Sequence, residues 1–231
     1  MKPEVICHMM GSIDGGLHPS RYTSSPDGER KDWSALYEHI HAELAGDAWL
    51  VGRVTMSEMS KAEPHPPAQS RAAERPVHIA RTADSYAVAL DRSGKLHFSA
   101  DNIGGDHVIV LLGSEVSDAH LAELVADGIS YLVAQDEDMA IAPLLEALSE
   151  HFGIQRLLLE GGGEINGRLL AAGVVDLLSV LIAPALDGGK GARGVATTDG
   201  GLAGKVELSF LSAETLDKGV VRLIYRVLPP R

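Results

Sequence analysis

Short apolar runs alternate with helically spaced apolar residues along the first two thirds of the chain. Within residues 32–44, apolar side chains recur every three or four positions until Gly46, a pattern that predicts an amphipathic helix. Further helices are expected to begin at Gly52 and to span residues 117–126, 140–151 and 165–172. Apolar runs bounded by polar or glycine-containing segments predict strands at residues 5–10, 48–51, 77–80, 86–90, 107–112, 130–134 and 156–159.

The last third of the sequence changes character. Strand-like runs at residues 177–183, 206–211 and 220–227 follow one another without an intervening helix, and a glycine-rich loop fills residues 187–204. Alternating strands and helices followed by strands alone predict an α/β fold with three layers, a mostly parallel central sheet and antiparallel C-terminal edge strands. With 231 residues and 45% hydrophobic content, one domain over residues 1–231 is favoured over two small ones.

Charge and composition narrow the classes of partner. A formal net charge of −12 argues against nucleic acid and anionic membrane, whereas a small phosphorylated ligand stays possible if arginines and backbone N–H groups assist. No apolar run approaches the roughly 20 residues that span a bilayer, and no signal-peptide pattern is present, so a cytoplasmic protein is expected.

The single Cys7 is interpreted as a core thiol, and no metal site is expected because His39 and His41 would point to different helix faces.

A glycine turn offers the clearest candidate site. Glu160-Gly161-Gly162-Gly163 joins a buried strand to a helix, so the backbone can approach a ligand and the first-turn N–H groups point toward it. The dinucleotide fingerprint does not match, because Asn166 stands where its last glycine is required. The spacing alone leaves two readings open, a phosphate site and a tight strand-to-helix turn.

Three motifs in register resemble a known family. The glycine turn is followed by Asn166, Leu169, Leu170, Gly173, Val175 and Asp176, and then by Ile182, Pro184 and Gly188-Gly189. This run is similar to the signature of the reductase domain of riboflavin biosynthesis, which shares its fold with dihydrofolate reductase. Ser12-Ile13-Asp14-Gly15 resembles the Ser-Leu-Asp-Gly motif of that family, and Gly52-Arg53-x-Thr55 resembles the Gly-Arg-x-Thr of dihydrofolate reductases.

The resemblance implies roles for particular residues. NADPH phosphates would lie against Gly161, Gly162, Gly163, Glu164, Ile165 and Asn166, and against Gly52, Arg53 and Thr55, with the guanidinium of Arg53 on the 2′-phosphate. Arg81 would recognise the adenosine end. As catalytic residues, Glu160 would reach the substrate and Asp14 would position or protonate it. The alternatives are a turn-capping Glu160, a simple Asp-Gly turn at Asp14, and surface charges at both arginines.

The implied activity is an NADPH-dependent reduction at the ribosylamino C1 of 5-amino-6-(5-phosphoribosylamino)uracil or its diaminopyrimidine counterpart, by a homodimer. Gly16 departs from the family, which often has Lys or Arg there, and only Lys61, Arg21 and Arg30 offer charge for a substrate phosphate. We therefore retain two alternatives, a dihydrofolate reductase-like enzyme for another small substrate and a non-catalytic nucleotide-binding protein.

Overall fold

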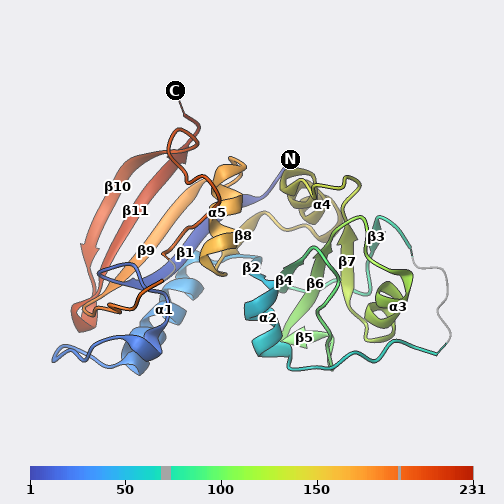
Figure 1. Cartoon of the computed structure of the whole chain (residues 1–231), viewed down its shortest axis with the longest axis horizontal. Coiled ribbons are helices and arrows are strands. Elements are labelled where there is room, and N and C mark those ends of the chain that lie inside the picture. Colours follow the sequence, from blue (N-terminus) through green and yellow to red (C-terminus); the bar gives the residue numbers. More distant parts are fainter. Residues whose placement is uncertain (69–73, 192–193, 231) are drawn as a thin grey trace. The chain divides into compact units, whose positions relative to one another are not determined.

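The structure is a computed structural model that describes residues 1–68, 74–191 and 194–230. The chain divides into two compact units. Unit 1 comprises Met1–Pro3 and Asp47–Leu157, and unit 2 comprises Glu4–Gly46 and Leu158–Arg231. Unit 2 is therefore assembled from two separate stretches of the sequence, and the long middle stretch belongs to unit 1 (Figure 1).

Unit 1 is built on parallel strands. The strands β2 (Ala48–Gly52), β4 (Tyr86–Asp91), β6 (Asp106–Leu112) and β7 (Ser130–Val133) pair in that order, all parallel. Two short strands, β3 (Val77–His78) and β5 (Asn102–Ile103), pair antiparallel with β7 and β6. The helices of this unit are α2 (Arg53–Ser60), α3 (Asp118–Ala126) and α4 (Ile141–Phe152). Every residue of β4 and β7 is buried, as expected for a parallel sheet covered on both faces.

Unit 2 contains the C-terminal antiparallel strands. Figure 1 shows β1 (Glu4–Ser12), β9 (Leu177–Ala183), β11 (Val221–Leu228) and β10 (Glu207–Thr215) side by side. The β1–β9 pair is parallel, and the other two pairs are antiparallel. On its other side β1 is bordered by β8 (Arg156–Leu159). The helices are α1 (Arg30–Leu44) and α5 (Gly163–Ala171), with single 3₁₀ turns at Pro19–Arg21 and Asp217–Gly219.

One side of unit 2 is closed by α1. Its buried Trp33 and Ile40 belong to an apolar cluster with Leu181 and Ala183 of β9. The Trp33 indole N–H donates to the carbonyl of Lys218 at 3.2 Å, so the polar end of this large side chain is also satisfied. The amphipathic spacing of residues 32–44 thus packs where the sequence predicts.

The predicted fold class is confirmed, since the strands are mostly parallel with antiparallel C-terminal strands. Differences occur at element ends. The predicted strand 77–80 is confined to Val77–His78, and β10 continues to Thr215, beyond the predicted end at residue 211. The extension was missed because residues 212–215 are exposed and carry no alternating apolar pattern. That the whole chain forms one domain stays a prediction. No helix in the described ranges is both long and apolar enough to cross a bilayer.

Candidate functional site

The glycine turn lies between β8 and α5 in unit 2. Gly162 has φ 59°, in the left-handed region that favours glycine, and it is the N-cap residue of α5. No side chain caps this helix, and the space around a Cβ placed on Gly162 is empty within 4 Å. The first-turn N–H groups of a helix have no intrahelical partners, so this start has the polarity that an anion requires.

The two neighbouring glycines have a different reason to be glycine. A Cβ on Gly163 would collide with the carbonyl oxygen of Gly194, and a Cβ on Gly167 would collide with the backbone of Thr197. Thr197 also donates its N–H to the carbonyl of Gly163 at 2.8 Å. The segment 194–198 therefore packs directly on one face of α5, at a distance that excludes any side chain.

Asn166 serves the same packing. It is fully buried, and its Nδ2 donates to the carbonyl of Val195 at 2.7 Å. Its Oδ1 has no hydrogen-bond partner among the described residues. The side chain thus fastens the glycine-rich loop to α5, while the predicted contact between Asn166 and a cofactor stays a prediction.

Glu160 ends β8 inside a cluster of polar side chains. His41 of α1 lies with its Nδ1 at 2.8 Å from Glu160 Oε1, while the hydroxyl of the neighbouring Tyr37 donates to the carbonyl of His8 at 3.2 Å. Burial, followed by the nearby carboxylate, raises the pKa of Tyr37 well above its usual value. Burial and then Glu160 likewise raise the pKa of Cys7 to about 12, so this thiol is a neutral core residue, as the sequence predicts. Glu160 is therefore a positioned carboxylate, one tenth exposed, and not a freely solvated charge.

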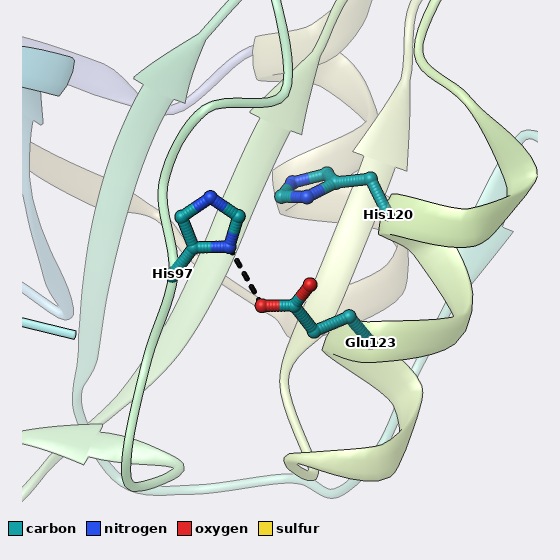
Figure 2. A group of neighbouring side chains, drawn as sticks. All are labelled: His97, His120 and Glu123. Atoms are coloured by element: carbon teal, nitrogen blue, oxygen red, sulfur yellow. Dashed lines mark hydrogen bonds and ion pairs between the residues drawn. The ribbon is translucent and has the colours of Figure 1, made fainter. Parts of the chain in front are cut away.

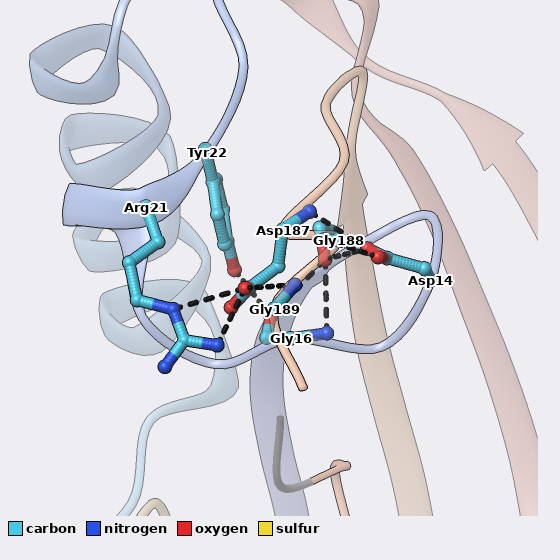
Figure 3. A network of polar contacts seen from close by, with 8 residues as sticks. Asp14, Gly16, Arg21, Tyr22, Asp187, Gly188 and Gly189 are labelled. Carbon is cyan, nitrogen blue, oxygen red and sulfur yellow. Dashed lines mark hydrogen bonds and ion pairs between the residues drawn. The ribbon is translucent and has the colours of Figure 1, made fainter. Parts of the chain in front are cut away.

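Asp14 joins two loops of unit 2 (Figure 3). Its Oδ1 accepts from the Ser12 hydroxyl at 2.5 Å and from the Asp187 N–H at 2.9 Å, while Oδ2 accepts from the Gly188 N–H at 2.7 Å. These hydrogen bonds, with that of Ser12 the largest, lower the pKa of Asp14 to about 2. A carboxylate that is ionised at neutral pH carries no proton to donate, so positioning is favoured over protonation of a substrate.

The same network engages Arg21. Its guanidinium donates to Asp187 Oδ1 from Nε at 2.9 Å and from Nη2 at 2.6 Å. Asp187 Oδ2 is buried without a hydrogen-bond partner in the described part of the chain. A Cβ on Gly16 would collide with the Asp187 side chain, so a larger residue at this position, where the family often has Lys or Arg, would have to displace Asp187. The positive charge of Arg21 is thus paired with the carboxylate of Asp187 (Figure 3).

In unit 1, α2 begins at a second glycine. Gly52 is its N-cap residue, and again no side chain caps the helix. Arg53 is exposed at the first helical position, and it forms no ion pair within the ranges that the structure describes. Thr55 lies half-buried in the same first turn. An uncapped helix start beside an unpaired guanidinium is suited to bind a phosphate.

Arg81 lines a separate depression of unit 1. The cavity has a volume of about 450 Å³ and is bordered by residues 81–85 and Gly105. Arg81 Nε donates to Asp101 Oδ2 at 2.8 Å, and this bond contributes to a lowered pKa of Asp101, after the hydrogen bond from Asn102. The volume suits a small ligand, although the ion pair offsets the positive charge predicted to favour NADPH.

Sequence reasoning missed the partners that hold these residues. His41 of α1 lies far from Glu160 in the sequence, and Asp187 lies far from Asp14. No spacing rule connects them, because only the pairing of β1 with β9 brings the two loops together. The glycines were the one usable signal in the sequence for these contacts, because the backbone of the 194–198 segment can pack against α5 only where α5 has glycine.

Known proteins resemble this chain in sequence and in fold. The sequence is 28% identical over 235 residues to the 2,5-diamino-6-ribosylamino-4(3H)-pyrimidinone 5′-phosphate reductase of Methanothermobacter thermautotrophicus, covering 96% of this chain and 97% of that protein. A pyrimidine reductase-like protein of Corynebacterium diphtheriae has the same fold, with a TM-score of 0.66, 19% identity, and coverage of 98% of this chain and 92% of that one.

Acinetobacter baumannii RibD matches with a TM-score of 0.67 and 23% identity, over 98% of this chain and 58% of its own length. This chain thus corresponds to part of the longer RibD protein. The sequence profile of the RibD C-terminal domain matches residues 3–222, which include the Ser12–Gly15 loop, both glycine-capped helix starts and Glu160. The resemblance seen in the three motifs is therefore confirmed, and the chain belongs to the RibD C-terminal domain family.

Proposed function

We propose that the protein is an NADPH-dependent reductase that acts on a phosphorylated ribosylaminopyrimidine, the substrate class named for its Methanothermobacter relative. The observation that carries this proposal is the match of the RibD C-terminal domain to almost the whole chain. Since the relative is aligned along nearly its full length, the comparison includes every segment that the predicted site uses.

The residues present fit a nicotinamide dinucleotide. Two helices begin at glycines without a capping side chain, α2 in unit 1 and α5 in unit 2, and their first-turn N–H groups lack intrahelical partners, as a phosphate site requires. Arg53 supplies a guanidinium that other described groups do not neutralise. In unit 1, we assign the 2′-phosphate to Arg53. In unit 2, the start of α5 at Gly161, Gly162 and Gly163 is suited to a pyrophosphate, with backbone contacts from Glu164 and Ile165.

The substrate role falls to Glu160. Its carboxylate is fixed by His41, so it can accept a hydrogen bond from the pyrimidine amino groups in a constant orientation. Asp14 acts on the loop geometry, because its three hydrogen bonds keep residues 187–188 against the Ser12–Gly15 turn. Neither residue is needed as a nucleophile.

When bound, NADPH supplies the hydride that reduces C1 of the opened ribosyl group. The protein then has to orient the substrate and exclude water. Such a reaction needs little covalent help, which agrees with the fixed, hydrogen-bonded carboxylates found here. The second candidate, a reductase for a pterin, is favoured by no particular observation.

The proposal is tested by following NADPH oxidation with three substrates in parallel. We expect turnover with 2,5-diamino-6-ribosylamino-4(3H)-pyrimidinone 5′-phosphate or with 5-amino-6-(5-phosphoribosylamino)uracil, and none with dihydrofolate. Glu160→Gln should bind NADPH like the wild type but lose turnover. Turnover with dihydrofolate alone would show that the proposed substrate is wrong. NADPH binding without any turnover would favour the non-catalytic alternative.

We also propose a cytoplasmic homodimer. Along β10, Leu208, Phe210 and Leu211 are 49%, 59% and 44% exposed, which is unusual for large apolar side chains on one strand. A second copy of the chain packed on this strand would bury them. Light scattering should give twice the chain mass, and Phe210→Lys should shift it toward the monomer.

A further inference from the structure

Two histidines and a glutamate converge in unit 1, and none of the three has a role assigned above. Figure 2 shows His97, His120 and Glu123 pointing toward a common space. A ligand atom from each lies within 4.8 Å of the others, which is the spacing of a potential metal centre. The residues come from the loop between β4 and β5 and from α3.

The local sequence fixes this arrangement. His120 and Glu123 are three residues apart on α3, so they share one helix face, and the Ser117 hydroxyl caps this helix by accepting the His120 N–H at 3.2 Å. The loop that carries His97 is anchored on both sides of it, since Leu96 and Phe98 are each 1% exposed. The three side chains are therefore held by rigid surroundings.

The second observation is an unsatisfied buried nitrogen. His120 is 6% exposed, and its Nε2 has no hydrogen-bond partner among the residues that the structure describes. Glu123 is 2% exposed, and a buried carboxylate requires a compensating positive charge or strong donors. Two imidazoles lie next to its carboxylate: His97 Nδ1 is 2.6 Å from Oε1, and His65 Nδ1 is 3.3 Å from the same oxygen.

We propose that His97, His120 and Glu123 bind one zinc ion, with a water molecule as the fourth ligand. Two imidazoles and one carboxylate form a donor set that Zn²⁺ accepts, leaving one position open. Zinc bonds of about 2.0–2.1 Å place tetrahedral ligand atoms about 3.3 Å apart, so the His97–Glu123 contact lengthens slightly to admit the ion.

His65 belongs to an overlapping group with Glu123 and Asp127 but is already engaged. Its Nδ1 lies 2.7 Å from the carbonyl of Glu63, and its Nε2 lies 3.0 Å from Asp127 Oδ2. His65 is exposed, unlike the other two histidines. It therefore serves as the matched control. The ion would connect the 92–101 loop to α3 and stabilise unit 1 by binding only the folded state.

The test is calorimetric titration of the tag-free, metal-stripped chain with ZnCl₂, with visible spectra of the CoCl₂ complex as a second readout. We expect one ion per chain, a rise in the melting temperature, and cobalt bands typical of tetrahedral coordination. His120→Gln and His97→Gln should each weaken zinc binding by at least about tenfold, whereas His65→Gln should change it by no more than about twofold.

Three results would overturn the proposal: absence of zinc binding by the wild type, equal affinity in His120→Gln and the wild type, or a loss in His65→Gln as large as in His120→Gln. Far-UV circular dichroism of each metal-free variant shows whether it is folded. His97 is partly exposed, so His97→Gln provides the decisive comparison if His120→Gln does not fold. NADPH oxidation is a separate measurement, and its failure would leave this inference unaffected.

Discussion

The predicted site residues of the two units differ in what their side chains already contact. In unit 2, Asp14, Glu160 and Asn166 all form hydrogen bonds within the protein, and Gly163 packs against a neighbouring backbone. In unit 1, Arg53 is exposed and forms no ion pair with a described residue. The side chains of the unit 2 motifs are therefore engaged in holding loops, whereas the motif of unit 1 leaves a charged side chain exposed to solvent.

A family motif can therefore contain two kinds of residue, those that stabilise the fold and those that bind a ligand. Replacing a residue whose side chain or backbone is packed or hydrogen-bonded within the protein should lower the free energy of unfolding. Replacing a residue whose side chain faces solvent should weaken ligand binding instead. The four predictions below test that separation, beginning with the largest expected effect.

Gly167→Ala should destabilise unit 2 most strongly. The new methyl group would collide with backbone atoms of Thr197, which cannot rotate away as a side chain can. Overpacking of this kind lowers the free energy of unfolding by about 3 kcal/mol, and urea denaturation of the variant and the wild type would measure the difference. Gly194→Ala is the control, because a Cβ there meets no atom within 4 Å. Equal stability of the two variants would show that α5 and the 194–198 segment do not pack closely.

Acid should weaken unit 2 through His8. Burial, and secondarily Arg222, lowers the pKa of His8 from 6.5 to about 4. The unfolded chain therefore takes up a proton before the folded one, so the stabilisation is complete above pH 6.5 and is lost as the pH falls toward 4. By linkage, the unfolding free energy should fall by about 2 to 3 kcal/mol between neutral pH and pH 4.5.

The comparison variant for this effect is His8→Asn, which has no group that titrates in that range. Urea denaturation at both pH values should give a smaller acid-dependent loss than in the wild type. An unchanged loss would assign the effect to the other buried histidines with lowered pKa, His107 and His120.

Arg53→Ala should weaken NADPH binding and leave NADH binding nearly unchanged. The loss of a charge-assisted hydrogen bond to the 2′-phosphate corresponds to about 1.5 kcal/mol, or about tenfold in Kd by calorimetry. Arg226→Ala, which removes another exposed arginine, controls for the change in net charge. Equal losses for both cofactors would remove Arg53 from the 2′-phosphate site.

Arg81→Ala should have the smallest effect, about twofold to threefold on NADPH affinity, since its guanidinium is shared with Asp101 in an exposed ion pair. Asp101→Asn should act in the opposite direction and strengthen NADPH binding, because it frees the charge of Arg81. If Asp101→Asn weakened binding, the adenosine end would have to lie elsewhere.

Sequence reasoning recovered the order of elements and the strand-to-helix turns at Gly52 and Gly162, because periodicity and glycine placement are local properties. It could not identify His41 as the partner of Glu160, or Asp187 as the partner of Asp14, since these contacts arise from tertiary structure. It expected no metal site because His39 and His41 would point to different helix faces, and the distant His97 and His120 show no ligand spacing in the sequence. The roles of Arg53, Arg81 and Glu160 toward ligands stay predictions.

The division of the chain also bears on how it folds during synthesis. Strand β1 is made well before its neighbour β9, whose Leu177 lies opposite Ile6 in the sheet. Nearly all of unit 1 is one continuous segment, so it can fold while the nascent β1 still lacks that partner. Unit 2 depends on pairings of large sequence separation, which form slowly. Until β9 is made, the apolar β1 strand is the segment most exposed to chaperones and to aggregation.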